Sequence, residues 1–150
     1  MRILYLHGLE GKPTGSKVAH LIGEHFIMSP TLPKDDFPES VRIARDALAE
    51  DPDLIIGSSR GGAVAMSLET AIPRILIAPA WKKFGADPAS VTDRDIVIHS
   101  RDDDVVPFAD SGALCPPARL VDAGSGHQSD PGKLEALGEE VASLDRHEKS

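Results

Sequence analysis

Short runs of Ile, Leu and Val recur along the chain, and turn residues or helical patterns separate them. Runs of this kind are typical of strands that are buried on both faces of a parallel sheet. The pattern predicts six strands, at Ile3–Leu6, His25–Met28, Asp53–Ile56, Arg74–Ile77, Ile96–Ile98 and Arg119–Val121.

Apolar residues at helical spacing lie between most of these runs. The expected helices span Ser16–Glu24, Pro38–Glu50, Arg60–Thr70 and Pro131–Arg146. The third is apolar almost all round, as a buried helix is, and Asp130 precedes the fourth as an N-cap. The link from Ala80 to Arg94 shows no convincing helical pattern, and we expect a loop over the active site there.

Strands that alternate with helices predict an α/β fold of three layers, with about six parallel strands flanked by helices. A chain of 150 residues suits a single domain over residues 1–150, with a minimal lid or none. Ligands bind beyond the carboxyl ends of the strands in such sheets. The residues just after each apolar run are therefore the candidates for function.

Composition narrows the possible partners and the compartment. The formal net charge of −8 argues against nucleic acid, whose phosphates favour a basic surface. Cys115 is the only cysteine, so no intramolecular disulfide can form, and the first apolar run is too short for a signal peptide or a membrane span. We expect a cytoplasmic protein without a membrane partner. The oligomeric state stays open.

Residues 57–61 read Gly57-Ser58-Ser59-Arg60-Gly61, a G-x-S-x-G match between a strand pattern and a helix pattern. A sharp turn there exposes the serine hydroxyl, and side chains at the glycine positions would collide with neighbouring elements. Ser59 is the expected nucleophile, because only Ser59 has glycine two residues away on both sides. The alternative is a Gly/Ser-rich turn that only caps the helix.

A serine nucleophile needs a base and a carboxylate that orients the base. His127 lies in a glycine-rich loop after the last predicted strand and is the expected base. Three aspartates, at positions 102 to 104, follow the fifth strand and are candidates for the acid. The order Ser, Asp, His along the chain is the one expected for this fold. His99 ends the fifth apolar run, and we expect a structural role for it.

The oxyanion hole needs two backbone N–H donors, for which Arg60 and Leu9 are the candidates. We expect the substrate pocket to be formed by His7, Gly8, Trp81 and Arg101. No metal and no cofactor are expected, because no two histidines or cysteines stand at ligand spacing and the early glycines do not form a dinucleotide fingerprint.

Basic residues gather at the same predicted edge of the sheet, although the whole chain is acidic. They are Lys12, Arg60, Lys82 and Arg101. A cleft of one charge attracts the opposite charge, so they point to an anionic substrate group. The alternative is that they form rim ion pairs with Glu10, Asp102 and Asp104, or that the Arg60 side chain points into solvent.

Several of these segments together resemble one protein family. Leu4-Tyr5-Leu6-His7-Gly8, with Pro13 and Ser16-Lys17, resembles the opening of the small bacterial YqiA-like esterases of the α/β-hydrolase superfamily. The segment from His99 to Pro107 resembles the H-G-x-x-D-x-V-V-P segment that carries the acid, although Ser100 replaces the usual glycine. The match selects Asp103, four residues before Pro107. The resemblance implies six parallel strands flanked by helices, and activity on short acyl esters.

The leading hypothesis is therefore a serine hydrolase that cleaves short-acyl carboxylic esters or thioesters of small molecules through an acyl-enzyme. Its triad is Ser59, Asp103 and His127. One alternative is a catalytically silent ligand-binding module on a hydrolase scaffold, since a fold does not determine a function. Another is an amidase or peptidase, which uses the same triad.

Overall fold

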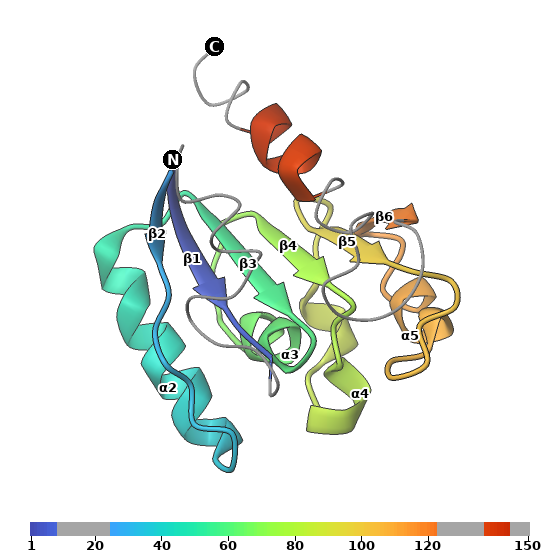
Figure 1. The fold of residues 1–150 in the computed structure, drawn as a ribbon, viewed down its shortest axis with the longest axis horizontal. Helices are drawn as coiled ribbons and strands as arrows, with labels where there is room; N and C mark the ends of the chain where they lie inside the picture. Colours follow the sequence, from blue (N-terminus) through green and yellow to red (C-terminus); the bar gives the residue numbers. More distant parts are fainter. Residues whose placement is uncertain (9–24, 123–136, 145–150) are drawn as a thin grey trace.

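The computed structural model describes residues 1–8, 25–122 and 137–144. Their strands form a single six-stranded parallel sheet with the order β2-β1-β3-β4-β5-β6 (Figure 1). The strands are β1 (Arg2–Leu6), β2 (Phe26–Met28), β3 (Leu54–Ser58), β4 (Arg74–Ile77), β5 (Ile96–His99) and β6 (Arg119–Asp122). All six predicted strands are confirmed. Their parallel pairing brings the carboxyl ends to one edge, toward which the arrowheads of β1, β3 and β4 point.

The described helices are short, apart from α2. They are α2 (Phe37–Ala47), η1 (Leu48–Glu50), α3 (Arg60–Met66), α4 (Trp81–Phe84), η2 (Pro88–Ser90) and α5 (Phe108–Gly112). Residues 137–144 are also helical, which agrees with the last predicted helix as far as it is described. The predicted helix Ser16–Glu24 lies outside the described residues.

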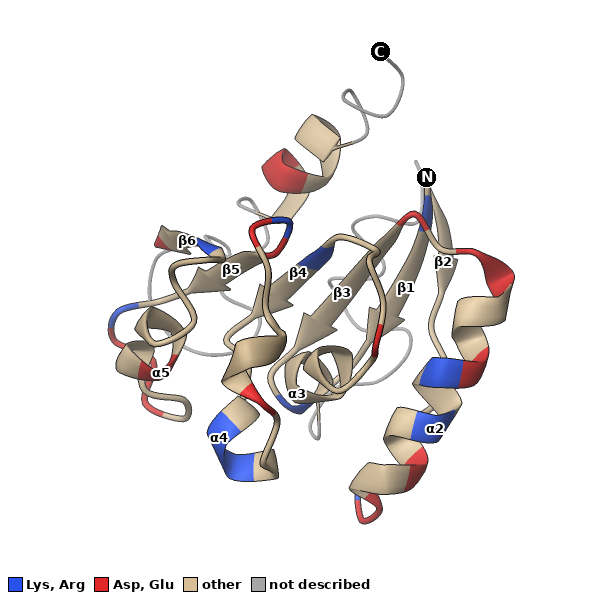
Figure 2. Cartoon of the chain, turned by 180° about the vertical axis from the view of Figure 1, so that it is seen from behind, with Lys and Arg blue, Asp and Glu red and all other residues tan. Residues whose placement is uncertain are grey.

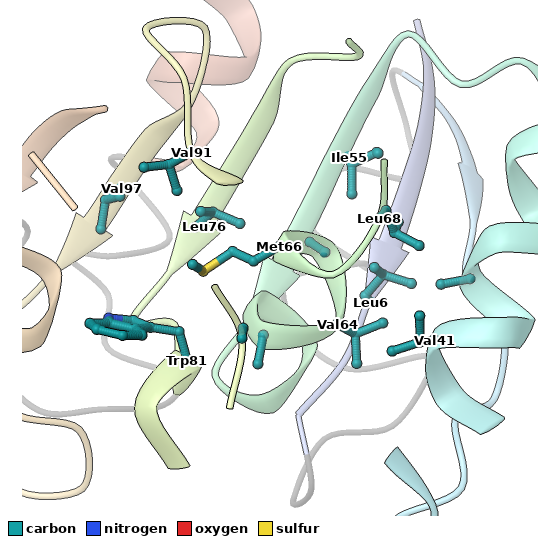
Figure 3. Packing of buried hydrophobic residues seen from close by; sticks show 14 of the residues in the cluster. Leu6, Val41, Ile55, Val64, Met66, Leu68, Leu76, Trp81, Val91 and Val97 are labelled. Carbon is teal, nitrogen blue, oxygen red and sulfur yellow. The ribbon is translucent and has the colours of Figure 1, made fainter. Parts of the chain in front are cut away.

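Alternate residues of the central strands point to opposite faces of the sheet and contribute to two hydrophobic layers. Leu4, Ile55 and Leu76 pack on one face with α2, α3 and α4, the side that faces the viewer in Figure 2. Figure 3 shows Met66, Leu76 and Trp81 in this layer. The opposite faces of the same strands pack against the apolar side of segment 137–144. A sheet buried on both faces explains why its strands read as continuous apolar runs.

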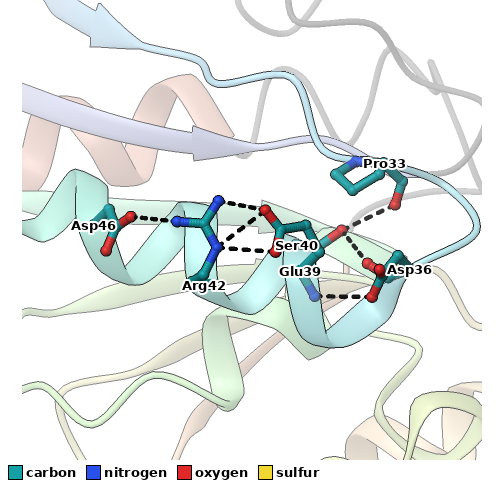
Figure 4. A network of polar contacts seen from close by, with 6 residues as sticks. All are labelled: Pro33, Asp36, Glu39, Ser40, Arg42 and Asp46. Atoms are coloured by element: carbon teal, nitrogen blue, oxygen red, sulfur yellow. Dashed lines mark hydrogen bonds and ion pairs between the residues drawn. The ribbon is translucent and has the colours of Figure 1, made fainter.

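The start of α2 is fixed by a network of short polar contacts (Figure 4). The Asp36 side chain caps the helix by accepting a hydrogen bond from the Glu39 N–H at 3.0 Å. The Ser40 hydroxyl donates to the Pro33 carbonyl at 2.9 Å, and Arg42 pairs with carboxylates one turn before and one turn after it. The segment before α2 is thereby attached to the helix.

Two helix predictions need correction. The link 80–94 contains α4 and η2, each only one turn long, and a single turn is too short to give a helical repeat in the sequence. The helix α3 ends at Met66, not Thr70. The Ser67 hydroxyl donates back to the Ala63 carbonyl at 2.9 Å, and Leu68 N–H bonds three residues back to Ala65, a pattern that tightens and ends a helix.

Candidate active site

Ser59 lies on a strained turn between β3 and α3. Its backbone has φ 56° and ψ −115°, a combination that residues with a Cβ rarely adopt. The turn is held in place because Ser59 N–H donates to the Ile77 carbonyl at 2.8 Å, and its own carbonyl accepts from Ala80 N–H at 3.0 Å. The Ser59 side chain makes no capping hydrogen bond to α3. The Ser59 hydroxyl is therefore not used to cap this helix.

The glycines around Ser59 are required because neighbouring segments approach their backbone too closely for a side chain. A Cβ on Gly57 would lie 2.5 Å from the Gly61 carbonyl oxygen, and one on Gly61 would lie 2.0 Å from the Leu6 carbonyl oxygen. A Cβ on Gly62 would lie 2.8 Å from the Pro79 Cβ. The first turn of α3 can approach β1 and β4 this closely only without side chains, as the sequence motif predicted.

Ser58, the rival serine, is the last residue of β3 and is buried. Its side chain forms a hydrogen bond with Tyr5 of β1. Burial raises the pKa of Tyr5 to about 12, and the bond from Ser58 offsets only part of that effect. The Ser58 hydroxyl is thus engaged with a neutral phenol inside the protein, whereas Ser59 is half-buried at the turn of the motif.

Of the three candidate acids, only Asp103 is buried; Asp102 and Asp104 are exposed. One carboxylate oxygen of Asp103 accepts hydrogen bonds from Val105 N–H and Val106 N–H, both at 2.8 Å. The other lies 3.1 Å from Nε2 of His99. The carboxylate is therefore fixed in one orientation just beyond the end of β5.

His99 supports Asp103 directly, which the sequence reading did not identify beyond a structural role. Its ring is fully buried, with Nε2 between the Asp103 carboxylate and the Val106 carbonyl, which is 2.9 Å away. Two acceptors at Nε2 require a hydrogen on that nitrogen. Nδ1 lies 2.6 Å from the Ser111 hydroxyl in α5. The sequence signal that could have predicted this contact is the spacing of four residues between His99, at the end of β5, and Asp103.

The loop after β1 lies beside Ser59, the expected nucleophile. A Cβ on Gly8 would be 3.3 Å from the Ser59 Cβ and 4.0 Å from the Arg60 backbone nitrogen. His7 fixes this loop: its Nε2 accepts from Leu32 N–H at 3.1 Å, so its Nδ1 carries the hydrogen and donates to the Gly8 carbonyl at 2.8 Å. His7 and Gly8 thus shape the space in front of Arg60 N–H. Leu9, the other expected oxyanion donor, lies outside the described residues.

The remaining predicted site residues fall in three places. His127 lies outside the described residues. Trp81 is buried in the main hydrophobic layer, and its indole N–H donates to the Asp110 carbonyl at 2.9 Å. Arg101 is exposed and pairs with Asp122 of β6 at 2.5 Å. Its guanidinium also lies over the Phe108 ring. Whether Trp81 and Arg101 line a substrate pocket stays a prediction.

Other candidate features do not coincide with this edge. A hollow of about 430 Å³ lies at the far end of α3, lined by residues such as Met66, Thr70 and Ser90. No three His, Cys, Asp or Glu side chains in the described part of the chain are grouped as metal ligands. The same residues include no helix with the length and apolarity to cross a membrane.

Comparisons with solved structures identify the fold. A protein described as a hydrolase of the alpha/beta superfamily, from Xanthomonas campestris pv. campestris, is 25% identical with a TM-score of 0.71, over 97% of this chain and 98% of its own. Est1E from Butyrivibrio proteoclasticus is 16% identical with a TM-score of 0.70, over 97% and 88% of the two chains. An alpha/beta hydrolase enzyme from lagoon sediments of Mar Chica, Morocco, is 13% identical with a TM-score of 0.74, over 100% and 92%.

No family model matches the sequence, and no curated protein matches it. The six-stranded parallel sheet flanked by helices and its structural relatives define an α/β-hydrolase fold. Neighbours that are named as hydrolases and esterases share this fold with the chain.

Proposed function

We propose that the protein is a serine hydrolase with Ser59 as nucleophile, His127 as base and Asp103 as the acid that orients the base. The observation that carries the proposal is the strained backbone of Ser59, whose side chain makes no capping hydrogen bond and which lies beside Gly8 and the Arg60 backbone nitrogen. Backbone strain of this kind persists where function requires it.

The chemistry follows the Ser-His-Asp scheme. His127 takes the proton of the Ser59 hydroxyl as its oxygen attacks the substrate carbonyl carbon. The N–H groups of Arg60 and Leu9 stabilise the oxyanion that forms. The imidazolium then gives its proton to the leaving group, which departs as an alcohol or thiol. A water activated by the same base hydrolyses the acyl-enzyme, and Asp103 orients His127 throughout.

The proposed substrates are carboxylic esters or thioesters of small molecules with short acyl groups. The described link between β4 and β5 contains only the one-turn helices α4 and η2, which offer little apolar surface to a long chain, so added methylenes gain little buried apolar area. The specificity constant across p-nitrophenyl esters of increasing length tests this. We expect its maximum at short acyl groups, and a maximum at long chains would contradict the substrate class.

Covalent labelling tests the nucleophile. A fluorophosphonate probe should modify the wild-type protein at Ser59, as located by mass spectrometry of its peptides. Ser59→Ala should abolish labelling, and Ser58→Ala is the matched control that should keep most of it. Labelling of Ser58 alone would refute the assignment. A folded protein that neither reacts with the probe nor cleaves esters would instead be a silent binding module.

A further inference from the structure

Arg60 is a buried cation next to the proposed nucleophile. Its side chain is 2% exposed. Within the described residues its guanidinium donates one hydrogen bond, from Nη2 to the Pro33 carbonyl at 2.9 Å, and Nε has no hydrogen-bond partner. In the part of the chain that the structure describes, it forms no ion pair with a carboxylate. The expectation that this side chain points into solvent is therefore wrong.

The other described members of the basic cluster do have carboxylate partners. Lys82 pairs with Asp110 at 3.4 Å, and Arg101 pairs with Asp122 at 2.5 Å. Both pairs lie at the exposed rim, where such pairs contribute little and are screened by salt. Figure 2 shows Lys and Arg at the start of α3 and on α4, on the same edge of the molecule. Arg60 differs from these two residues in being buried and in forming no ion pair with any carboxylate of the described ranges.

Aromatic rings replace water around the Arg60 guanidinium. Its central carbon lies 5.4 Å from the ring centroids of Phe37 and of Phe84, and these two rings stack with centroids 5.2 Å apart. Burial lowers the pKa of Arg60, and Asp35 and Asp36 partly oppose this from beyond ion-pair distance. The guanidinium nevertheless stays charged at neutral pH. An unscreened charge attracts an anion more strongly than a rim charge does.

The position of this cation is fixed by contacts with α2, the segment before it, and α4. Pro33 precedes α2 and is itself attached to that helix through Ser40, while Phe84 belongs to α4 and Arg60 begins α3. The backbone nitrogen of the same residue lies near Gly8, 4.0 Å from where a Cβ on Gly8 would be, in the region where the oxyanion is proposed to form. The charge is therefore held one residue from the nucleophile and cannot swing away to a distant partner.

We propose that Arg60 selects substrates that carry a carboxylate on the acyl group, remote from the scissile carbonyl. A guanidinium matches the planar carboxylate and has donors to spare, including the unpartnered Nε. A hydrogen-bonded carboxylate would satisfy a buried donor that finds no partner within residues 1–8, 25–122 and 137–144. The proposal rests on the proposed hydrolase activity and names the substrate class for the same site.

Two esters with the same leaving group test the proposal: 4-nitrophenyl butyrate and mono-4-nitrophenyl succinate, which differ by the terminal carboxylate. The measured quantity is the specificity constant of the charged ester divided by that of the neutral one. We expect this ratio to fall about tenfold or more in Arg60→Gln, because hydrogen bonds to charged groups discriminate by at least that factor. Arg60→Lys, which keeps the charge without the planar fork, should give an intermediate ratio.

Arg45→Gln is the matched control, since Arg45 is exposed on α2 and its loss changes the net charge equally. It should leave the ratio within about twofold. The salt dependence of the ratio distinguishes the effect of a buried cation from that of exposed rim charges. A ratio set by Arg60 should largely persist in 0.5 M NaCl, whereas a ratio set by exposed charges should fall to near one. Fluorescence of Trp81, the only tryptophan, verifies that each variant is folded.

The possible failures are distinguishable. If Arg60→Gln slows both esters by the same factor, the side chain only supports Pro33 and the aromatic pair, and the proposal is overturned while the hydrolase assignment stands. The same holds if the ratio falls equally in Arg45→Gln. If the wild-type protein cleaves neither ester and the fluorophosphonate leaves Ser59 unmodified, the proposed function fails, and the substrate class fails with it.

Discussion

At the scale of single residues, the strain at Ser59 predicts a gain in stability when it is released. Glycine adopts φ 56° and ψ −115° without a Cβ penalty, whereas alanine keeps the penalty. Both Ser59→Gly and Ser59→Ala lose the hydroxyl, so their difference isolates the backbone term. The greater backbone entropy of glycine in the unfolded chain offsets part of this gain. We expect Ser59→Gly to be more stable than Ser59→Ala by about 1 kcal/mol, or roughly 2–4 °C in Tm. Equal melting temperatures in calorimetry would contradict the strain.

The contacts of Asp103 predict that an amide cannot replace its carboxylate. One oxygen accepts from two backbone N–H groups, so the amide oxygen of Asp103→Asn would take that place. Its NH₂ would then face the hydrogen on His99 Nε2, donor against donor. We expect kcat/KM to fall about a thousandfold or more, because the base loses its orienting acid.

Asp102→Asn and Asp104→Asn are the controls for this change, since both side chains are exposed on the same turn. They should alter kcat/KM only a few-fold. Equal losses from all three variants would mean that the acidic turn has a structural role alone.

The sequence predicts Ser59 and Asp103 as site residues because each lies in a local motif with a fixed spacing. The partners of Arg60 could not be predicted in this way. Pro33, Phe37 and Phe84 come from separate segments, and only the packing of α2, α3 and α4 brings them to one guanidinium. The sequence therefore places a charge near the proposed nucleophile but does not say whether that charge is paired.

At the scale of elements, a buried ion pair connects β4 and β5 at the edge opposite the proposed site. Arg74 Nε and Nη2 donate to the two oxygens of Asp95 at 3.0 and 2.7 Å. Nη1 also donates to the Ala65 carbonyl at the end of α3, and Nη2 to the Ser90 carbonyl of η2. Both side chains are almost fully buried, with 3% and 2% of their area exposed.

Removing one member of this pair should leave an uncompensated buried charge. We expect Asp95→Ala to lower the free energy of unfolding by about 3–5 kcal/mol. The exposed neighbour Asp93 provides the control, and Asp93→Ala should change stability by only about 0.5 kcal/mol. Urea denaturation followed by Trp81 fluorescence measures both. A loss below about 1 kcal/mol for Asp95→Ala would show that water or a rearranged Arg74 replaces the carboxylate.

Helices and strands could be predicted from the sequence where apolar residues recur at a regular spacing or form continuous runs. The strands of a doubly covered sheet are continuous apolar runs, and all six were found from the sequence. One-turn helices give no repeat, which is why α4 and η2 were missed. The end of α3 depends on the Ser67 hydroxyl, which forms a hydrogen bond with its own helix. The pattern of apolar residues does not predict this hydrogen bond.

At the scale of the whole molecule, the order of the strands brings the proposed site together. β3 lies between β1 and β4, so the turn carrying Ser59 is adjacent to the loop that begins at His7 and Gly8. Asp103 follows β5 on the same edge. Residues almost a hundred positions apart thus share one end of the sheet, a consequence of all-parallel pairing that the alternation of strands and helices already implied.

The two-sided burial of this sheet predicts how stability responds to alkaline pH. Tyr5 lies in the layer that packs against segment 137–144 and is 5% exposed, and burial raises its pKa to about 12. In the unfolded chain the phenol titrates near its ordinary pKa of about 10. Between these two values the unfolded chain has lost the proton that the folded protein keeps, so stability falls as pH rises. Below about pH 10 the phenol is neutral in both states and contributes no pH dependence.

We expect the free energy of unfolding to decrease by about 2–3 kcal/mol between pH 10 and 12 through this group. Tyr5→Phe should lose that part of the decrease, although it also loses the bond to Ser58. The difference between the two proteins across the pH series isolates the phenol, because lysines titrate alike in both. Tyr5 is the only tyrosine, so absorbance at 295 nm reports its ionisation directly. Tyrosinate that forms near pH 10 in the folded protein, with parallel stability curves for the two proteins, would contradict this burial of Tyr5.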